Sequence, residues 1–192
     1  MSVGKVFVAS MNMRGERAQC APNTTSINVT SAQAKRNVNR LHFSPMTPIE
    51  GGYKGFWCFE NYWQSGKVFE TIPPEISREW WMQLKEPKRR FPKGKGKAVL
   101  FAQFEGYDEP MDYVTARKRV YVPEYFNLIK DSVYMKQLKQ RLKEGESFTL
   151  YDFDGPRLSD KTPICLEITP ELLIEKINDV SFPLDILLLR VY

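Results

Sequence analysis

Residues 55–70 read Gly-Phe-Trp-Cys-Phe-Glu-Asn-Tyr-Trp-Gln-Ser-Gly-Lys-Val-Phe-Glu, and the interpretation of the whole chain starts from this stretch. From Phe59 onward it predicts a helix with two unlike faces. One face is aromatic, because bulky rings recur at three- and four-residue steps along it. The residues on this face are Phe59, Tyr62, Trp63, Gly66 and Phe69.

The other face of the predicted helix carries Glu60, Gln64 and Lys67. Their spacing of i, i+4 and i+7 places a carboxylate, an amide and an ammonium on one stripe, within about 60° of each other. Such a stripe is either a solvated face or the polar wall of a pocket. The flanking rings argue against a fully exposed helix, and spacing alone leaves both interpretations open.

The composition is that of a globular chain with many rings, since its 192 residues are 42% hydrophobic and 13% aromatic. This length predicts a single domain over residues 1–192, with an N-terminal strand and loop in residues 1–30 and the main body in residues 31–192. No apolar run reaches the roughly 20 residues that cross a bilayer, and no signal-peptide pattern opens the chain. We therefore expect a cytoplasmic protein without a membrane partner.

Cysteine and histidine usage narrows the chemistry. Cys20, Cys58 and Cys165 are scattered without a Cys-x-x-Cys spacing, which argues against a disulfide framework and a zinc site and suits a reducing compartment. Because His42 is the only imidazole, histidine-cluster metal catalysis and Ser-His-Asp chemistry are disfavoured. We expect no metal and no cofactor, and in an enzyme the carboxylates would transfer protons.

The net charge of +5 is concentrated in two places. Seven Lys and Arg residues crowd the segment from Lys85 to Lys97, and residues 117–119 read Arg-Lys-Arg. Basic patches suit phosphate-bearing partners such as a nucleic acid, a nucleotide or a sugar phosphate. A solubilising surface loop explains the same charges equally well.

The remaining pattern predicts an α+β fold, mainly helical with a few short strands. Strands are expected at residues 5–10, 98–104, 147–153 and 164–168. Helices are expected at residues 32–41, 74–85, 123–142 and 170–178. Residues 98–104 also fit the start of a helix, residues 11–28 predict a loop, and residues 184–192 form an apolar closing segment.

Several motifs follow an order found in one known family. Phe43-Ser44-Pro45 precedes an irregular loop with Gly55 and Trp57, and Glu-Asn-Tyr-Trp-Gln-Ser-Gly-Lys-Val-Phe follows at residues 60–69. This order resembles the NADAR family, whose members carry an Asn-Phe-Ser-Pro-like element and a Glu-His-Tyr-Phe-Gln-Ala-x-Lys-Phe helix. The matching positions are Glu60, Tyr62, Gln64 and Lys67, with Phe69 one place later than in the family.

The resemblance extends more weakly to about Asp154. The segment around Arg89 and Arg90 sits near the family's basic site, and the turn at residues 142–145 and the strand at residues 148–151 take later places. The family's His after the Glu is Asn61 here, and its Gly-rich C-terminal signature is absent. The chain is therefore expected to be a divergent NADAR-like member with an atypical C-terminus.

What the resemblance implies is N-glycosidase chemistry on ribosides. Members cleave the base–ribose bond of a riboflavin-pathway intermediate, or remove ADP-ribose attached to guanine in DNA. Cleavage of a C1′–N bond passes through an oxocarbenium-like cation, which a carboxylate can stabilise while it activates water. The implied partner is a phosphate-bearing riboside or an ADP-ribosylated nucleobase, free or in nucleic acid.

The expected site residues divide by role. Glu60 is the catalytic carboxylate, Gln64 positions ribose hydroxyls or water, and Lys67 keeps Glu60 ionised or binds phosphate. The expected substrate-binding residues are Phe43, Trp57, Tyr62, Trp63, Arg89, Arg90, Arg117, Asp152 and Asp154. Core packing competes for Tyr62 and Trp63, and an ordinary turn competes for the two aspartates.

Two other classes of function fit the same residues. In a non-catalytic nucleic-acid or nucleotide binding protein, the rings would stack on bases and the lysines would meet phosphates. A structural or interaction protein on a degenerate enzyme fold is the third interpretation.

Overall fold

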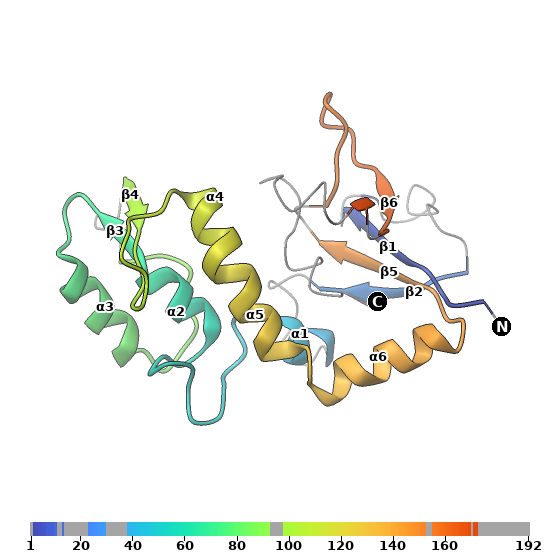
Figure 1. Ribbon diagram of the computed structural model, residues 1–192, viewed down its shortest axis with the longest axis horizontal. Helices are drawn as coiled ribbons and strands as arrows, with labels where there is room; N and C mark the ends of the chain where they lie inside the picture. The colour runs from blue at the N-terminus through green and yellow to red at the C-terminus, as the bar shows by residue number, and fades with distance from the viewer. Residues whose placement is uncertain are drawn as a thin grey trace. The chain divides into compact units, whose positions relative to one another are not determined.

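The computed structural model describes residues 2–10, 13, 23–29, 38–92, 98–152, 155–169 and 171–172. The chain divides into two compact units, of which unit 1 contains residues 1–44 and 126–192 and unit 2 contains residues 45–125. Helices and short β-sheets make up an α+β fold (Figure 1). The single domain expected from chain length stays a prediction, which one cooperative unfolding transition would support.

Unit 1 is built on a four-stranded sheet with the strand order β2-β5-β1-β6. Its strands are β1 (Val6–Ser10), β2 (Thr25–Asn28), β5 (Phe148–Asp152) and β6 (Cys165–Glu167). β5 runs parallel to both β1 and β2, whereas β6 runs antiparallel to β1. The register aligns Val8 and Ile27 with Leu150, and all three side chains are buried at the centre of the sheet.

The predicted strands of this sheet are confirmed in three cases, namely β1, β5 and β6. The loop predicted for residues 11–28 is wrong at its end, because Thr25–Asn28 pairs with β5 as strand β2. Only Ile27 is buried in this Thr-Ser-Ile-Asn strand, so no apolar alternation marks it in the sequence. The helix predicted at residues 170–178 lies almost entirely outside the described residues, and the closing segment 184–192 lies wholly outside them.

Helices α1 (Val38–Phe43) and α6 (Val133–Lys143) also belong to unit 1. The first part of the helix predicted at residues 32–41 lies outside the described residues. Ser132 caps the start of α6, where its hydroxyl accepts a hydrogen bond from the backbone N–H of Met135 (3.2 Å), and Gly145 with its φ of 97° follows the end of the helix. The buried residues of α6 are Met135, Leu138 and Leu142.

Cys165 in β6 is disulfide-bonded. The cysteine spacing argued against a disulfide framework and did not foresee this bond, so it no longer supports a reducing compartment. Spacing failed because it says nothing about which distant cysteines meet in the fold. Cys58 is a buried free thiol, and burial raises its pKa to about 11.

Unit 2 contains the stretch from which the sequence analysis began. Its helices are α2 (Phe59–Ser65), α3 (Pro74–Gln83), α4 (Tyr113–Ala116), the π-helix η3 (Arg117–Tyr121) and α5 (Val122–Ile129). α5 runs on into residues of unit 1. A two-stranded antiparallel ribbon completes the unit, formed by β3 (Lys67–Phe69) and β4 (Val99–Ala102).

The core of unit 2 is aromatic and surrounds α2, all seven residues of which are buried. The ring of Phe59 lies 5.3 Å from Tyr53 and 5.2 Å from Tyr121 between centroids. Trp63 stacks on Phe104 at 5.5 Å with an angle of 14° between the ring planes. Such ring pairs each add about 0.5–1.5 kcal/mol beyond their buried area. The aromatic face predicted from the spacing of these rings is thus confirmed where the helix exists.

The predicted helix continues too far, however, because α2 ends before Gly66 and Lys67–Phe69 forms strand β3. The carbonyl oxygen of Gly66 accepts a hydrogen bond from Gln103 N (2.7 Å), and a Cβ on Gly66 would overlap the ring of Phe104. Gly66 therefore packs against Gln103 and Phe104, next to β4, and the helix does not continue for another turn. Lys67 does not continue the helical stripe that its spacing predicted.

Two further predicted elements of unit 2 are confirmed, and the structure shows which of their residues are buried. The helix expected at residues 74–85 is confirmed as α3, but Ile76 is 55% exposed and the buried positions are Ser77 and Trp81. The strand at residues 98–104 is confirmed as β4, although Val99 and Leu100 are exposed on a two-stranded ribbon. Among the described helices, none combines the length and apolar composition that a bilayer span requires.

Candidate functional site

The polar side chains of α2 form a buried carboxylate–amide pair. Glu60 is 9% exposed and Gln64 is 7% exposed. Gln64 Nε2 donates a hydrogen bond of 2.7 Å to Oε1 of Glu60, which its i, i+4 spacing allows. The solvated-face interpretation therefore does not hold for these two residues.

Lys67 reaches this pair from strand β3 rather than from the helix. Burial lowers the pKa of its ammonium group below the ordinary value of 10.5, and the charge of Glu60 partly opposes that shift. The helical spacing therefore picked out three residues that do interact. Lys67, however, interacts with Glu60 from strand β3 and not from the helix.

The first turn of α2 also holds two other motif segments in place. Glu60 N donates to the carbonyl oxygen of Pro45 (2.8 Å), which fixes the end of the Phe-Ser-Pro motif. Asn61 is fully buried, where Nδ2 donates to the carbonyl oxygen of Glu86 (3.0 Å) and Oδ1 accepts from Lys88 N (3.1 Å). The start of the basic segment is therefore anchored next to Glu60.

Asn61 is a residue that the sequence analysis missed, since it entered only as a departure from the family pattern. Its role depends on backbone groups 25 and 27 positions away. We call these two hydrogen bonds the Asn61 clamp. No periodicity or local sequence motif predicts it. The only available signal was an amide inside a stretch of rings, which must find partners if it is buried.

The basic candidates that follow this clamp are exposed. Lys88 forms an ion pair with Glu86 (2.7 Å), and Arg89 Nε lies 3.3 Å from the sulfur of Met46. Arg89 and Arg90 both face solvent. Residues 93–97, which complete the predicted basic loop, lie outside the described residues.

Arg117 stands at the start of the π-helix, a type of turn that often occurs at functional sites. Its guanidinium lies over the rings of Tyr113 (5.6 Å) and Tyr121 (5.5 Å), and Nη1 donates to the Tyr113 hydroxyl (3.0 Å). Its Nε is buried, and no described residue accepts a hydrogen bond from it. An unsatisfied buried donor on a cation favours an anionic ligand.

The three ring candidates of unit 2 differ in exposure. Tyr62 is 2% exposed and Trp63 is 6% exposed, so both rings serve the core. Trp57, just before the helix, is half-buried and keeps part of its side chain accessible. Of the three, Trp57 can meet a ligand without disrupting the aromatic core.

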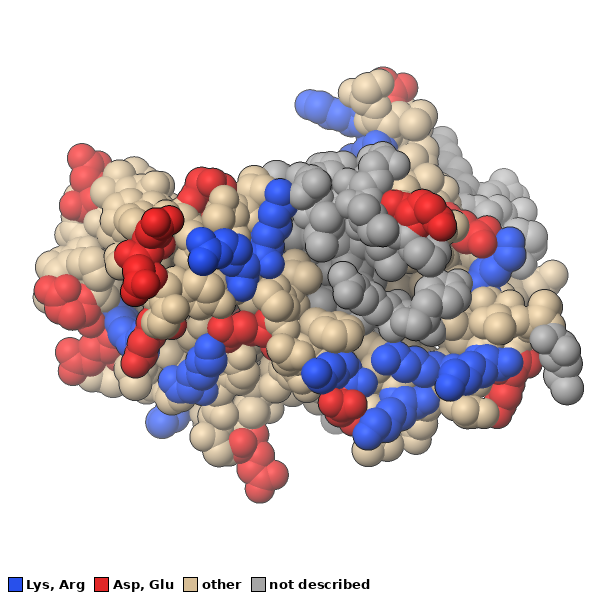
Figure 2. Space-filling model, in the orientation of Figure 1, with Lys and Arg blue, Asp and Glu red and all other residues tan. Residues whose placement is uncertain are grey.

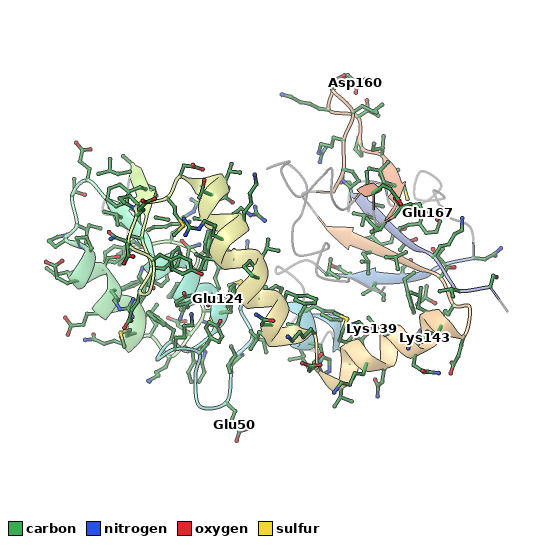
Figure 3. The ribbon with its side chains drawn as sticks, viewed as in Figure 1. Glu50, Glu124, Lys139, Lys143, Asp160 and Glu167 are labelled. Carbon is green, nitrogen blue, oxygen red and sulfur yellow. The ribbon has the colours of Figure 1, made fainter. Side chains whose placement is uncertain are left out.

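A second polar cluster joins the loop before α2 to α5, where Figure 3 labels Glu124. The Glu124 carboxylate accepts hydrogen bonds from the Tyr53 hydroxyl (2.7 Å), the Tyr62 hydroxyl (3.2 Å) and Lys54 Nζ (2.7 Å). Burial, followed by the interaction with Glu124, raises the pKa of both phenols. The sequence analysis did not identify this cluster.

Lys54 is an unusual residue for the turn that it occupies. With φ of 50° at Lys54 and 87° at Gly55, and two hydrogen bonds between Tyr53 and Phe56, the turn resembles type I′, which prefers Asn-Gly. The contacts of its ammonium group explain why lysine occupies this position. The group forms an ion pair with Glu124 and lies 4.8 Å from the centroid of the Tyr62 ring. This cluster fixes the loop that leads into α2.

The remaining candidates belong to unit 1 or lie outside the described residues. Phe43 belongs to unit 1, where its ring is buried and lies 5.2 Å from Tyr134. Asp152 ends strand β5 in the same unit, and its side chain is not described. Asp154 lies outside the described residues.

A pocket of about 440 Å³ opens near the C-terminal end of α2. Its lining includes Ser65, Phe104, and the ion pair of Arg78 with Glu105 (2.6 Å). None of the predicted site residues lines it, so we do not place the chemistry there.

Within the described ranges, no group of three or more His, Cys, Asp and Glu side chains is placed to hold a metal ion. Comparison of the chain with known protein families, with curated proteins and with solved structures finds no match.

Proposed function

We propose that the chain is an N-glycosidase that hydrolyses the base–ribose bond of a ribosylated or ADP-ribosylated nucleobase or nucleotide. The observation that supports this most is the buried pair of Glu60 and Gln64 together with the half-buried Lys67, whose ammonium group interacts with the charge of Glu60. Burying a carboxylate and an ammonium costs several kcal/mol for each ion before their attraction is counted. Apolar side chains would fit such a helix at lower cost, and ionisable groups kept in this way are typical of functional sites.

Glu60 takes the role of the catalytic carboxylate. As the C1′–N bond breaks, its electron pair moves to the base nitrogen and positive charge develops at C1′ and the ring oxygen. A carboxylate beside C1′ stabilises that charge and accepts a proton from the attacking water as the water oxygen bonds to C1′. It then passes that proton to the nitrogen of the leaving base, which restores the carboxylate. The hydrogen bond from Gln64 fixes the orientation of the carboxylate before substrate arrives.

The cations of unit 2 suit the phosphate of such a substrate. Lys67 is held near Glu60 in a partly buried position, where each charge is screened less than in water. Arg117 has a buried donor without a partner among the described residues, and the basic segment begins at the Asn61 clamp. Trp57 provides the accessible ring for stacking on the base.

A NADAR-like fold for the main body is part of the same proposal. Its support is that three motif segments of the resemblance meet at one helical turn. The carbonyl oxygen of Pro45 in the Phe-Ser-Pro motif accepts a hydrogen bond from Glu60 N. The basic segment is hydrogen-bonded to the side chain of Asn61, the next residue.

The test is a hydrolysis assay on a panel of ribosides, nucleotides and DNA carrying ADP-ribosylated guanine, with the released base or ADP-ribose measured by mass spectrometry. Wild type should release product, and Glu60→Gln should lower the rate by about 10²- to 10⁴-fold, as expected for loss of a catalytic acid–base group. The matched control is Glu70→Gln, since Glu70 is exposed a few residues further on, and it should retain full activity.

Two results would overturn the proposal. The first is a Glu60→Gln variant that is as active as wild type. The second is a folded wild type that is inert across the panel. If wild type and Glu60→Gln are equally inert yet both bind oligonucleotide, the non-catalytic binding function replaces the enzyme.

A further inference from the structure

We propose that helix α6 of unit 1 is a docking surface for the phosphate backbone of duplex nucleic acid, bound without regard to base sequence. The surface consists of Lys136, Lys139 and Lys143, which we call the α6 lysine stripe. It belongs to a different unit from Glu60 and is independent of the glycosidase proposal.

The three lysines share one side of the helix. At 100° per residue, the positions i, i+3 and i+7 fall within about 60° of each other. Lys136 and Lys143 are exposed and Lys139 is partly exposed. In the space-filling view, blue side chains form a row over α6, and Lys139 and Lys143 are labelled on that helix in the stick view (Figures 2 and 3).

No ion pair to a described residue neutralises the stripe. Arg141 on the same helix differs from these lysines because it is paired with an acid. Its guanidinium donates hydrogen bonds to both carboxylate oxygens of Glu146, at 2.7 and 2.6 Å. Lys139 and Lys143 stand at i and i+4, an arrangement of like charges that destabilises a helix. A surface shaped for helix stability alone would place an acid at one of these positions.

The helix dipole does not explain the stripe either. Lys143 in the last turn is favoured by the partial negative charge there, but Lys136 stands close to the first turn, where a cation is disfavoured. Glu144 is the nearest acid at the C-terminal end of α6, about 100° around the helix from Lys143. Its carboxylate accepts a hydrogen bond from Gln140 (2.8 Å) rather than from a lysine of the stripe.

The dimensions of the stripe match a nucleic-acid strand. Lys136 and Lys143 are separated by about 10 Å along the helix axis. One strand of a duplex carries a phosphate about every 3.4 Å along its axis, so the stripe faces about three phosphates. Lysines act as flexible point charges, which suits contact with the backbone without base recognition.

Two related partners fit the stripe less well. A helix that inserts into an anionic membrane surface needs a free apolar face, whereas the apolar face of α6 is buried as Met135, Leu138 and Leu142. Proteins that grip single strands offer exposed rings for base stacking. The exposed residues of α6 are Val133, Lys136, Gln137, Gln140 and Lys143, which include no ring.

The test measures binding of the full chain to a labelled mixed-sequence DNA duplex by fluorescence anisotropy, from about 25 to about 200 mM potassium chloride. Removing all three charges with Lys136→Gln, Lys139→Gln and Lys143→Gln should weaken binding at least tenfold at low salt. It should also reduce the slope of log K against log salt by about 2.7, since each phosphate contact contributes about 0.9. A second duplex of unrelated sequence should give the same affinity.

The matched control removes three exposed basic residues outside both basic patches, with Lys5→Gln, Arg157→Gln and Lys161→Gln, and so gives the same net charge. It should bind the duplex like wild type. Equal loss in both triple variants would overturn the proposal, because it would assign binding to net charge alone. Absence of wild-type binding at low salt, tighter binding to a single strand, or preference for anionic lipid vesicles would also overturn it.

Discussion

Nε2 of Gln64 lies 2.7 Å from Oε1 of Glu60, one helical turn away, and both side chains are buried. A hydrogen bond to a charged group contributes about 1.5–3 kcal/mol. The variant Gln64→Met keeps the length of the side chain but removes the donor. We expect the free energy of unfolding to fall by about that amount, and urea denaturation measures it.

The surface of α3 provides a matched control for this change. Gln83 Nε2 donates to Oε1 of Glu79 at 3.2 Å with the same i, i+4 spacing, but the pair is exposed. Gln83→Met should therefore change stability by less than about 0.5 kcal/mol. Equal effects of the two substitutions would contradict the importance that we assign to the buried pair. If the proposed activity is found, Gln64→Met should also lower kcat/KM.

The Asn61 clamp gives a second prediction. Replacing Asn61 with Ala leaves the carbonyl oxygen of Glu86 and the N–H of Lys88 without their partners. An unsatisfied buried group costs about 1–3 kcal/mol, so the expected loss of stability is about 2–4 kcal/mol. Cleavage by trypsin after Lys88 and Arg89 should accelerate, because the start of the basic segment loses its anchor.

The control for the clamp is Asn127→Ala. Asn127 is exposed and accepts a hydrogen bond only from Lys130 three residues away (2.9 Å). Its replacement should leave both stability and the rate of trypsin cleavage close to wild type. Wild-type behaviour of Asn61→Ala in both measurements would refute the clamp.

The helix α2 shows which part of the fold local sequence can specify. The spacing of Phe59, Tyr62 and Trp63 predicted its aromatic face correctly, because burial of one face imposes a helical period on neighbouring residues. Its end was predicted wrongly, since the contact that stops it comes from Phe104, far along the chain. The helical spacing of apolar residues predicts which side of a helix is buried, but it does not predict a contact with a ring such as Phe104 that lies far away in the sequence.

The same distinction separates the parts of the site. Glu60 and Gln64 are one turn apart, and their pairing follows from helix geometry. Asn61 and Glu124 act on segments far away in sequence, and no spacing identifies their partners. Strand β2 and the disulfide of Cys165 were missed for the same reason.

The end of α2 can be tested through Gly66. The backbone φ of −76° at this residue suits any amino acid, so the requirement for glycine comes from the Phe104 ring, which a Cβ would overlap. Gly66→Ala should destabilise the protein by about 1–3 kcal/mol, the usual cost of overpacking. In the double variant with Phe104→Leu, the second substitution should recover part of that loss. Purely additive effects in urea denaturation would contradict the contact.

Lys67 predicts a pH dependence of stability whose sign follows from its lowered pKa. Between the lowered folded-state pKa and the ordinary value of 10.5, the folded protein has released this proton while the unfolded chain still holds it. The unfolded state then binds more protons, so the contribution of Lys67 to the free energy of unfolding rises with pH, by at most about 1.4 kcal/mol per unit. This contribution levels off above 10.5.

Comparison with Lys67→Met isolates this contribution. Tyr53 and Tyr62 have raised pKa values and lower the stability above their ordinary value of 10.0, but they do so in both proteins. The difference in unfolding free energy, wild type minus Lys67→Met, should therefore increase from neutral pH towards 10.5. Urea denaturation at a series of pH values measures it, and the exposed Lys143→Met serves as control. A difference for Lys67→Met that is constant with pH would show that the ammonium is solvated in the folded state, and Lys67 would then not belong to the buried group around Glu60.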